Sequence, residues 1–369
     1  MIKQTKRGLW LKQIGLGVAG VGLANFKSFA ASADELATKP LNELAIRLSS
    51  NESPYGPSPL AKKAMSDYIG ISNRYNWQLT SELLNAIAIQ LNVTADNILM
   101  GAGSTEMLDL VARFSALQKG SLVIAEPSYA YWTDAAQKLG LKKINVSLTA
   151  EKKINLSGML SAIRPDTKLI YLCNPNNPTG TLCDRDELRK FISEATKKAI
   201  VLVDEAYIEY TDQQSLSNIA IENENLIITK TFSKIYGLAG ARVGYAVANT
   251  KTIEKLGELQ SWVNGSVSVA STAAALASLG DTKFRLETYT LNEKAKHFTI
   301  EQLVKLNLAC IPSYSNFIYF SLEKYTKDFF YQLKTNNIIG TKIYEEKGKW
   351  TRISVGTMSE MKKFISAIE

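Results

Sequence analysis

The stretch AIVLVDEAY, residues 199–207, indicates the class of fold. Its five apolar residues in a row end in two acidic residues, and such runs are typical of strands buried on both faces of a parallel sheet. Helical patterns such as DRDELRKFISEATKK (184–198) separate it from similar runs. Those runs are LVIAEP (122–127), KLIYLCNP (168–175) and NLIITKTFS (225–233). The chain is therefore predicted to be an α/β protein with a large, mostly parallel sheet covered by helices.

Length and composition limit the classes of function. A chain of 369 residues with 46% hydrophobic and 21% charged residues is typical of a folded protein, and its length favours two domains. The formal net charge is +8, but five basic residues and no acidic residue fall within residues 1–33. The rest of the chain is nearly balanced in charge, so we expect no nucleic-acid partner.

The sequence argues against disulfide and metal sites. Its three cysteines are odd in number and lack metal-ligand spacing, and His297 is the only histidine. A disulfide framework, a zinc site and a histidine-based triad are therefore not expected. The cysteines are Cys173, Cys183 and Cys310.

Residues 1–33 have the pattern of an export signal. A basic segment (1–12) precedes a short, glycine-rich apolar segment (13–26), and the A-x-A pattern of a cleavage site follows at residues 31–33. TKRGLWLK resembles the twin-arginine signal, with Lys6 in place of the first arginine. A periplasmic or exported protein is predicted, with a docked N-terminal arm in a cytoplasmic protein as the alternative. The apolar segment is too short for a stable membrane span.

Ligands of parallel sheets bind beyond the carboxyl ends of the strands, and this sequence places polar residues there. GAGST (101–105) leads into a helical pattern, where free N–H groups and the helix dipole suit a phosphate. Glycine at such a turn also allows close packing, so this motif alone leaves both interpretations open. Tyr129, in EPSYAYW (126–132), is placed either to cover a flat ligand or to pack in the core.

The next strands add further polar groups to the same edge. CNPNNPTG (173–180) is a rigid turn that can hold Asn177 toward it. Asp204 ends a buried run, with Tyr207 three residues later, although a helix N-cap is a structural alternative for the aspartate. The stretch TFSKIYGLAGARVGY (231–245) adds Thr231, Ser233, Lys234 and Arg242.

These groups match the needs of pyridoxal 5'-phosphate. The cofactor requires a lysine for its Schiff base, an acid facing the pyridine nitrogen and donors to the phenolic oxygen. It also requires a cup for its phosphate and an aromatic cover. The sequence therefore predicts a site for this cofactor at the carboxyl edge of the sheet.

The sequence resembles the fold-type I pyridoxal-phosphate aminotransferases of class I/II, most closely the histidinol-phosphate aminotransferase branch. The resemblance covers residues 48–369 and implies a homodimer and a second, smaller C-terminal α/β domain. Its motifs, in order, are LSSNESPYGPSP, GAGSTEM, PSYAYW, CNPNNPTG, VDEAYIEY, TFSKIYGLAGARVGY, PSYSNFIYF and RISVGTMSEM.

The resemblance implies a role for each matching residue. Lys234 would form the Schiff base and move the proton, Asp204 would pair with the pyridine nitrogen, and Asn177 and Tyr207 would contact the phenolic oxygen. Arg352 would hold the substrate α-carboxylate. The other implied cofactor contacts are Tyr129, stacked on the ring, and a phosphate cup of Gly103, Ser104, Thr105, Thr231, Ser233 and Arg242, which Tyr75 reaches from the neighbouring subunit.

Three departures from the family pattern bear on the substrate. NESP and RYN stand where the family usually has NENP and RYP, so the entrance beside Tyr75 is expected to differ. Thr341 stands near the place of a second arginine that binds the distal anion of histidinol phosphate. Lys342 is not expected to replace it, because adjacent strand residues point to opposite faces. We therefore expect a transaminase that acts on α-amino acids and 2-oxo acids.

Three alternatives stay open. One is a dedicated histidinol-phosphate aminotransferase, and another is a related pyridoxal-phosphate decarboxylase or lyase. A non-catalytic sensor is the third, but it would normally need a second module, for which the chain before residue 48 has no room. The predicted organisation is a signal-like segment (1–33), an arm (34–55), a large cofactor domain (56–265) and a small domain (266–369), divided at the polar break WVNGSVSVAS.

Overall fold

The computed structural model describes residues 45–369, of which Ile46–Glu369 form one compact unit. The predicted export signal and residues 34–44, half of the predicted arm, lie outside the described residues. The boundary near residue 265 stays a prediction. Within residues 45–369, no helix combines the length and the apolar character that a membrane crossing needs.

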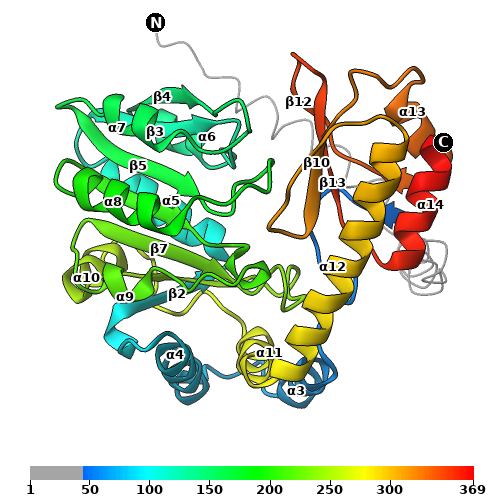
Figure 1. The fold of residues 1–369 in the computed structure, drawn as a ribbon. Helices are drawn as coiled ribbons and strands as arrows, with labels where there is room; N and C mark the ends of the chain where they lie inside the picture. Colours follow the sequence, from blue (N-terminus) through cyan, green and yellow to red (C-terminus); the bar gives the residue numbers. More distant parts are fainter. Residues whose placement is uncertain (1–44) are drawn as a thin grey trace, which may run out of the picture. The chain divides into compact units, whose positions relative to one another are not determined.

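A seven-stranded sheet forms the larger part of this unit (Figure 1). Its order is β2-β8-β7-β6-β5-β3-β4, and every neighbouring pair is parallel except the two that include β8. This arrangement confirms the mostly parallel sheet predicted from the apolar runs. The strands are β2 (Ile98–Ala102), β3 (Gly120–Glu126), β4 (Leu141–Ser147), β5 (Thr167–Cys173), β6 (Ile200–Asp204), β7 (Leu226–Thr231) and β8 (Val243–Val247).

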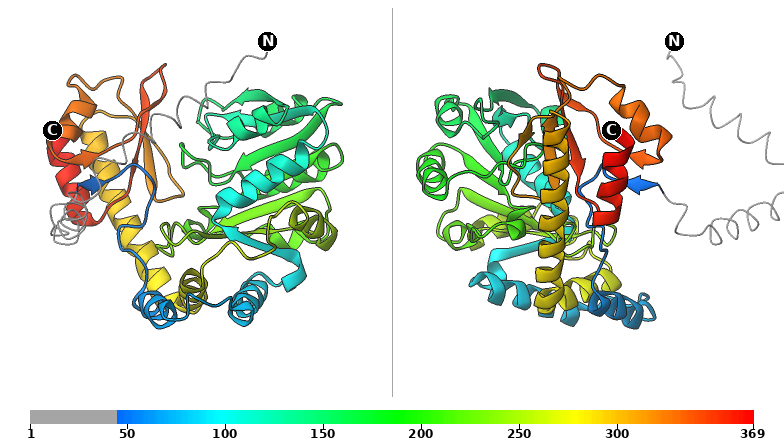
Figure 2. Two further views of the ribbon diagram at one scale, coloured as in Figure 1. Left: turned by 180° about the vertical axis from the view of Figure 1, so that it is seen from behind. Right: turned by 45° about the vertical axis from the view of Figure 1, so that its right-hand side comes forward.

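Helices cover both faces of this sheet, as its buried apolar strands require. Figures 1 and 2 show α8 on one face and α5 on the other. The predicted start of α8 is confirmed, because the Asp184 carboxylate accepts from the backbone N–H groups of Asp186 and Glu187. The helices of this part are α5 (Ser104–Ser115), α6 (Thr133–Lys138), α7 (Leu156–Ser161), α8 (Arg185–Ala195), α9 (Ser217–Ala220) and α10 (Thr250–Gly257), with short 3₁₀ turns at Ala95–Asn97 and Ile208–Tyr210.

A smaller sheet follows toward the carboxyl end of the chain. It is antiparallel, in the order β12-β13-β10-β9, and the long helix α12 runs beside it from α11 (Val269–Gly280) (Figure 1). Two short strands, β1 and β11, pair separately. The bounds are β1 (Ile46–Arg47), β9 (Cys310–Ile311), β10 (Phe317–Ser321), β11 (Ile338–Ile339), β12 (Ile343–Glu345), β13 (Trp350–Ser354), α12 (Thr282–Lys305), α13 (Phe329–Thr335) and α14 (Met358–Ile368).

Two hydrophobic cores correspond to the two sheets. One joins the seven strands to the helices around them, and the other lies between the smaller sheet, α12 and α14. Helices α3 (Pro59–Ile69), α4 (Trp77–Leu91) and α11 (Val269–Gly280) pack together below the larger sheet in Figure 1. Asn76, which replaces the family's proline after Tyr75, is the N-cap of α4 and accepts from the Leu79 N–H at 3.0 Å.

Candidate active site

A cavity of about 880 Å³ lies at the carboxyl ends of the parallel strands. Because β8 is antiparallel, its amino end meets the same edge and brings Arg242 there. The cavity gathers eleven of the thirteen predicted site residues from segments far apart in the sequence. They are Ser104, Thr105, Tyr129, Asn177, Asp204, Tyr207, Thr231, Ser233, Lys234, Arg242 and Arg352.

Asp204 is the last residue of β6 and is almost fully buried. Its two carboxylate oxygens accept from the hydroxyls of Thr229 and Tyr171, each at 3.2 Å. Burial raises the pKa of this carboxyl to about 6, and the two hydroxyls oppose that rise. The side chain is not the helix N-cap that the sequence left open, since the next helical turn is Ile208–Tyr210 and its N-cap is Tyr207. Among the described residues no cation forms an ion pair with this buried carboxylate, which therefore suits a ligand that carries a positive charge.

Lys234 follows β7 and lies in the loop that leads to Arg242. Its ammonium donates to the Ser50 carbonyl at 3.2 Å and lies 5.6 Å from the centre of the Tyr207 ring. Burial and, to a smaller extent, the positive charge of Arg352 together lower the pKa of Lys234 to about 8. Roughly a tenth of the amine is therefore neutral at pH 7, far more than for an ordinary lysine, and the neutral form is the one that attacks an aldehyde.

The hydroxyl of Tyr207 is oriented by two amides. The side-chain amide of Asn51 donates to it at 3.0 Å, and that of Asn177 at 3.3 Å. With both acceptor positions engaged, the Tyr207 hydroxyl proton is left to donate to an oxygen in the cavity. The pKa of Tyr207 is raised by burial, so the hydroxyl keeps that proton. Asn51 was missed by the sequence analysis, although it lies in the quoted motif LSSNESP.

The GAGST turn forms a cup for an anion. Helix α5 begins at Ser104, directly after Gly103 with a φ of 79°, so its first N–H groups face the cavity. Gly103 does not line the cavity itself, but a Cβ there would lie 2.3 Å from a terminal nitrogen of Arg242. The Thr231 hydroxyl donates to the Ser233 hydroxyl at 2.9 Å, beside the Arg242 guanidinium. This combination of helix N-terminus, hydroxyls and guanidinium suits a phosphate.

Arg352, on β13, is the buried cation of the opposite wall. One terminal nitrogen donates to the Asn177 amide oxygen at 2.5 Å, and the other donates to the Ser49 carbonyl. Its guanidinium lies 5.4 Å from the Phe317 ring and 5.5 Å from the Tyr344 ring. Among the described residues its Nε has no hydrogen-bond partner, which leaves a charged donor for a ligand. The groups of this cavity thus fit a phosphate-bearing aldehyde and a carboxylate beside it.

The sequence of residues 44–368 matches the family described as aminotransferase class I and II. The chain belongs to this family. It is 34% identical over 346 residues to histidinol-phosphate aminotransferase 1 of Dechloromonas aromatica. This match covers 90% of the chain and 94% of the relative. This similarity places the aminotransferase in the histidinol-phosphate aminotransferase branch, a family that uses pyridoxal phosphate.

Solved structures agree with this assignment. A putative histidinol-phosphate aminotransferase from Erwinia carotovora atroseptica has a TM-score of 0.83 at 31% identity and covers 88% of this chain and 95% of its own. The histidinol-phosphate aminotransferase of Sinorhizobium meliloti, in complex with pyridoxal-5'-phosphate, has a TM-score of 0.80 at 25% identity. The match covers 88% of this chain and 90% of that one. These matches confirm the predicted fold.

One expectation about the aminotransferase is wrong. Thr341 was expected to face the substrate and Lys342 to point away, whereas Lys342 lines the cavity and the Thr341 hydroxyl donates to the Arg352 carbonyl. The pairing of β12 with β13 shifts register between Ile343 and Glu345. Thr341 and Lys342 precede β12, and the consecutive residues Lys342, Ile343 and Tyr344 all line the cavity, so the alternation expected of a regular strand does not hold at this place. Lys342 is exposed, and its ammonium lies 5.6 Å from the Tyr344 ring.

Tyr75 lies outside this cavity. It is 74% exposed and packs with two tryptophans, at 6.0 Å from the Trp77 ring and 4.7 Å from the Trp262 ring. It borders a separate hollow of about 310 Å³ instead. Within one chain, Tyr75 therefore does not reach the predicted phosphate cup.

Proposed function

We propose that this aminotransferase holds pyridoxal 5'-phosphate in the cavity and moves an amino group between an α-amino acid and a 2-oxo acid. The observation that carries the proposal is that the Lys234 amine, the Asp204 carboxylate and the Arg352 guanidinium line one cavity. When bound, the cofactor supplies an electron sink for the negative charge that develops at the substrate α-carbon.

The residues of the chain divide the work of transfer. Lys234, as a neutral amine, would hold the cofactor through its aldehyde and is placed to move the proton at the substrate α-carbon. The Asp204 carboxylate would face a protonated ring nitrogen, whose charge would offset the cost of burying the carboxylate. The α5 N-terminus and Arg242 would hold the phosphate, and the Tyr207 hydroxyl would donate to the phenolic oxygen. Tyr129 would cover the ring.

Arg352 is the proposed partner of the substrate α-carboxylate. It is the buried cation of its wall, and its unpaired Nε supports a bond to an incoming anion. An ordinary α-amino acid has this carboxylate, whereas histidinol phosphate does not. A general or aromatic amino acid is therefore the favoured substrate.

Histidinol phosphate is the second candidate, and Lys342 is the observation in its favour. A substrate phosphate would meet Arg352 and Lys342 on the same wall of the cavity. The relatives named above as histidinol-phosphate aminotransferases support this candidate as well. Against it, Lys342 is exposed to solvent, where an ion pair contributes only about 0 to 1 kcal/mol.

A comparison of substrates in two enzymes distinguishes these candidates. Amino donors are assayed with 2-oxoglutarate and pyruvate beside histidinol phosphate, in the wild type and in Lys342→Met. We expect an α-amino acid to give the highest kcat/KM and Lys342→Met to leave that value within about twofold. A clear preference for histidinol phosphate, lost by about tenfold or more in Lys342→Met, would establish the second candidate instead.

A homodimer with shared sites is part of the proposal. The exposed cluster of Tyr75, Trp77 and Trp262 is apolar and lies outside its own cavity, which supports burial of these rings against a second copy. In that arrangement Tyr75 reaches the phosphate cup of the partner subunit.

Export is the remaining part. The basic segment, apolar segment and A-x-A pattern of residues 1–33 support a cleaved leader of twin-arginine type, with Lys6 in place of the first arginine. Terminal sequencing of the protein from fractionated native cells tests this idea. We expect a mature chain that begins near Asp34 outside the cytoplasm, and an intact Met1 in the cytoplasm would contradict it.

A further inference from the structure

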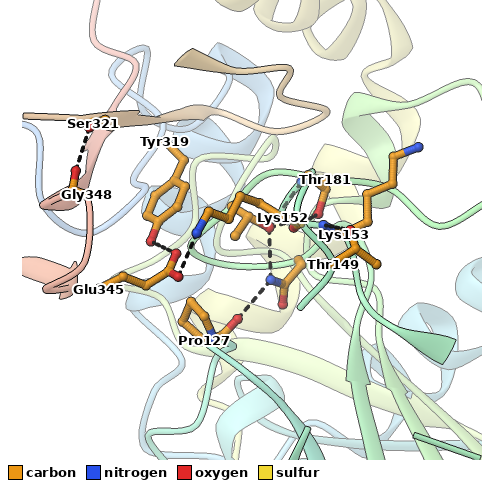
Figure 3. Close-up of polar contacts among 11 residues, drawn as sticks. Pro127, Thr149, Lys152, Lys153, Thr181, Tyr319, Ser321, Glu345 and Gly348 are labelled. Atoms are coloured by element: carbon orange, nitrogen blue, oxygen red, sulfur yellow. Dashed lines mark hydrogen bonds and ion pairs between the residues drawn. The ribbon is translucent and has the colours of Figure 1, made fainter. Parts of the chain in front are cut away.

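An ion pair joins the segment after β4 to β12 beside the cavity, at a place that the proposed chemistry does not use (Figure 3). The Lys152 ammonium lies 2.7 Å from a carboxylate oxygen of Glu345. Lys152 belongs to the segment between β4 and α7, and Glu345 is the last residue of β12. The two positions are 193 residues apart in the sequence. The pair therefore ties the edge of the larger sheet to the smaller sheet.

The surroundings of this pair distinguish it from an ordinary surface ion pair. The side chains of Lys152 and Glu345 are 17% and 24% exposed, whereas those of the Lys197–Glu194 pair are 63% and 52% exposed. The second oxygen of Glu345 accepts from the Tyr319 hydroxyl at 2.7 Å. Limited exposure and two directed partners make the carboxylate a fixed point rather than a mobile surface group.

Aromatic rings also contact the side chain of Lys152. The Lys152 ammonium lies 4.9 Å from the centre of the Trp350 ring, and that ring stacks on Tyr319 at 5.3 Å with an interplanar angle of 18°. A cation over an indole face is attracted by the ring quadrupole. Lys152 therefore contacts β13 through Trp350 as well as β12 through Glu345.

The other end of the link is anchored near Asn177. Lys152 has a φ of 62° in a tight turn, and its carbonyl accepts from the Thr181 hydroxyl at 2.9 Å. The Thr181 carbonyl in turn accepts from the Asn176 N–H at 2.8 Å. The turn that holds Lys152 is thus connected to the turn that presents Asn177 to Arg352.

We propose that Lys152 and Glu345 are positioning residues for the substrate, because their ion pair fixes the β12 wall of the cavity against the Asn177 turn. Strand β12 carries Tyr344, whose ring lies 5.5 Å from the guanidinium of Arg352. Loss of the pair would let this wall move away from the Asn177 turn. The inference rests on the proposed function, since it assumes that the amino donor binds against this wall.

Charge reversal tests the pairing itself. Lys152→Glu and Glu345→Lys are each expected to raise the KM of the amino donor about three- to tenfold, with kcat changed less. The double variant restores the pair with opposite polarity and is expected to recover most of the loss. Lys153→Glu is the matched control, because it makes the same charge change at an exposed neighbour that points away from Glu345 in Figure 3.

Hydrogen exchange of the segment 343–350 provides a readout that is independent of activity. Exchange should be faster in each single reversal and return toward the wild-type rate in the double variant. Lys152→Met and Glu345→Gln, alone and combined, give the same comparison if a reversed charge prevents folding. Wild-type KM and exchange in every single variant would overturn the inference, as would a double variant no better than the singles. If exchange is faster in the single variants and restored in the double variant, but the protein transfers no amino group, the proposed function is refuted while the ion pair between Lys152 and Glu345 still fixes the β12 wall.

Discussion

Asp204 illustrates how a functional residue reduces the stability of the chain that carries it. The pKa of its carboxyl is about 4 in the unfolded chain and about 6 in the folded chain, because burial disfavours the ionised form. The unfolded chain therefore gives up this proton at a lower pH than the folded chain does, and the free energy of unfolding falls as the pH rises from about 4 to about 6. At pH 7 to 8 the ionised side chain costs the cofactor-free protein roughly 2 to 3 kcal/mol.

Asp204→Asn is therefore expected to stabilise the cofactor-free protein while it abolishes most turnover. Urea denaturation at pH 7.5 should show a free energy of unfolding that is higher by about 2 kcal/mol, and the gain should vanish near pH 4. Turnover should fall by a factor of 100 or more, because the ring nitrogen loses its counter-charge. Asp212→Asn, at an exposed position, is the control and should change neither quantity. A destabilised Asp204→Asn protein with normal turnover would contradict the assigned role.

The lowered pKa of the Lys234 amine predicts how the rate of cofactor uptake depends on pH. Since burial lowers its pKa to about 8, the rate at which the cofactor-free protein takes up the aldehyde should rise about tenfold per pH unit below 8. It should level off above about pH 9. Stopped-flow absorbance in buffers without amines measures this profile. A rate that still climbs tenfold between pH 9 and pH 10 would show that the amine has the pKa of an ordinary lysine.

At the scale of elements, the turn from β2 into α5 depends on a glycine of the neighbouring strand. A Cβ at Gly244 on β8 would lie 2.2 Å from the backbone nitrogen of Ser104 and 2.4 Å from the carbonyl carbon of Gly103. Backbone atoms cannot rotate away as a side-chain tip does, so the helix N-terminus itself must shift. The close approach of β8 thus sets the place of the phosphate cup.

Gly244→Ala is expected to lower the free energy of unfolding by about 1 to 3 kcal/mol and to weaken cofactor binding about tenfold or more. Denaturation curves and equilibrium dialysis against the cofactor give the two quantities. Gly70→Ala is the control, because a Cβ there meets no atom within 4 Å and its φ is −66°. Tight cofactor binding in Gly244→Ala would show that the cup tolerates the shift.

Local sequence patterns predicted the elements of the large sheet better than the contacts between distant segments. Apolar runs and their polar ends predicted the sheet and most of the cavity, because parallel strands present their carboxyl ends to one edge. The Tyr207 partner Asn51 was missed, since only the fold brings the segment before α3 to that edge. Lys342 was assigned to the wrong face because it precedes β12 and does not follow the alternation of a regular strand. Tertiary structure, rather than residue type, accounts for both failures.

At the scale of the whole molecule, the proposed dimer predicts complementation between two inactive variants. Lys234→Ala and Tyr75→Ala are each impaired, but a mixed dimer contains one site with both wild-type residues if Tyr75 acts across the interface. Random mixing should then restore about a quarter of wild-type activity. If both residues act within one chain, no mixed dimer has an intact site and activity stays at the level of the separate variants.

The lysine that holds the cofactor can be identified by chemical trapping. Protein incubated with pyridoxal 5'-phosphate is reduced with borohydride, digested and mapped by mass spectrometry. We expect one stoichiometric modification, at Lys234, and its loss in Lys234→Ala with the fold intact by circular dichroism. Stoichiometric modification of another lysine, or none at all in folded protein, would contradict the assignment of the active site.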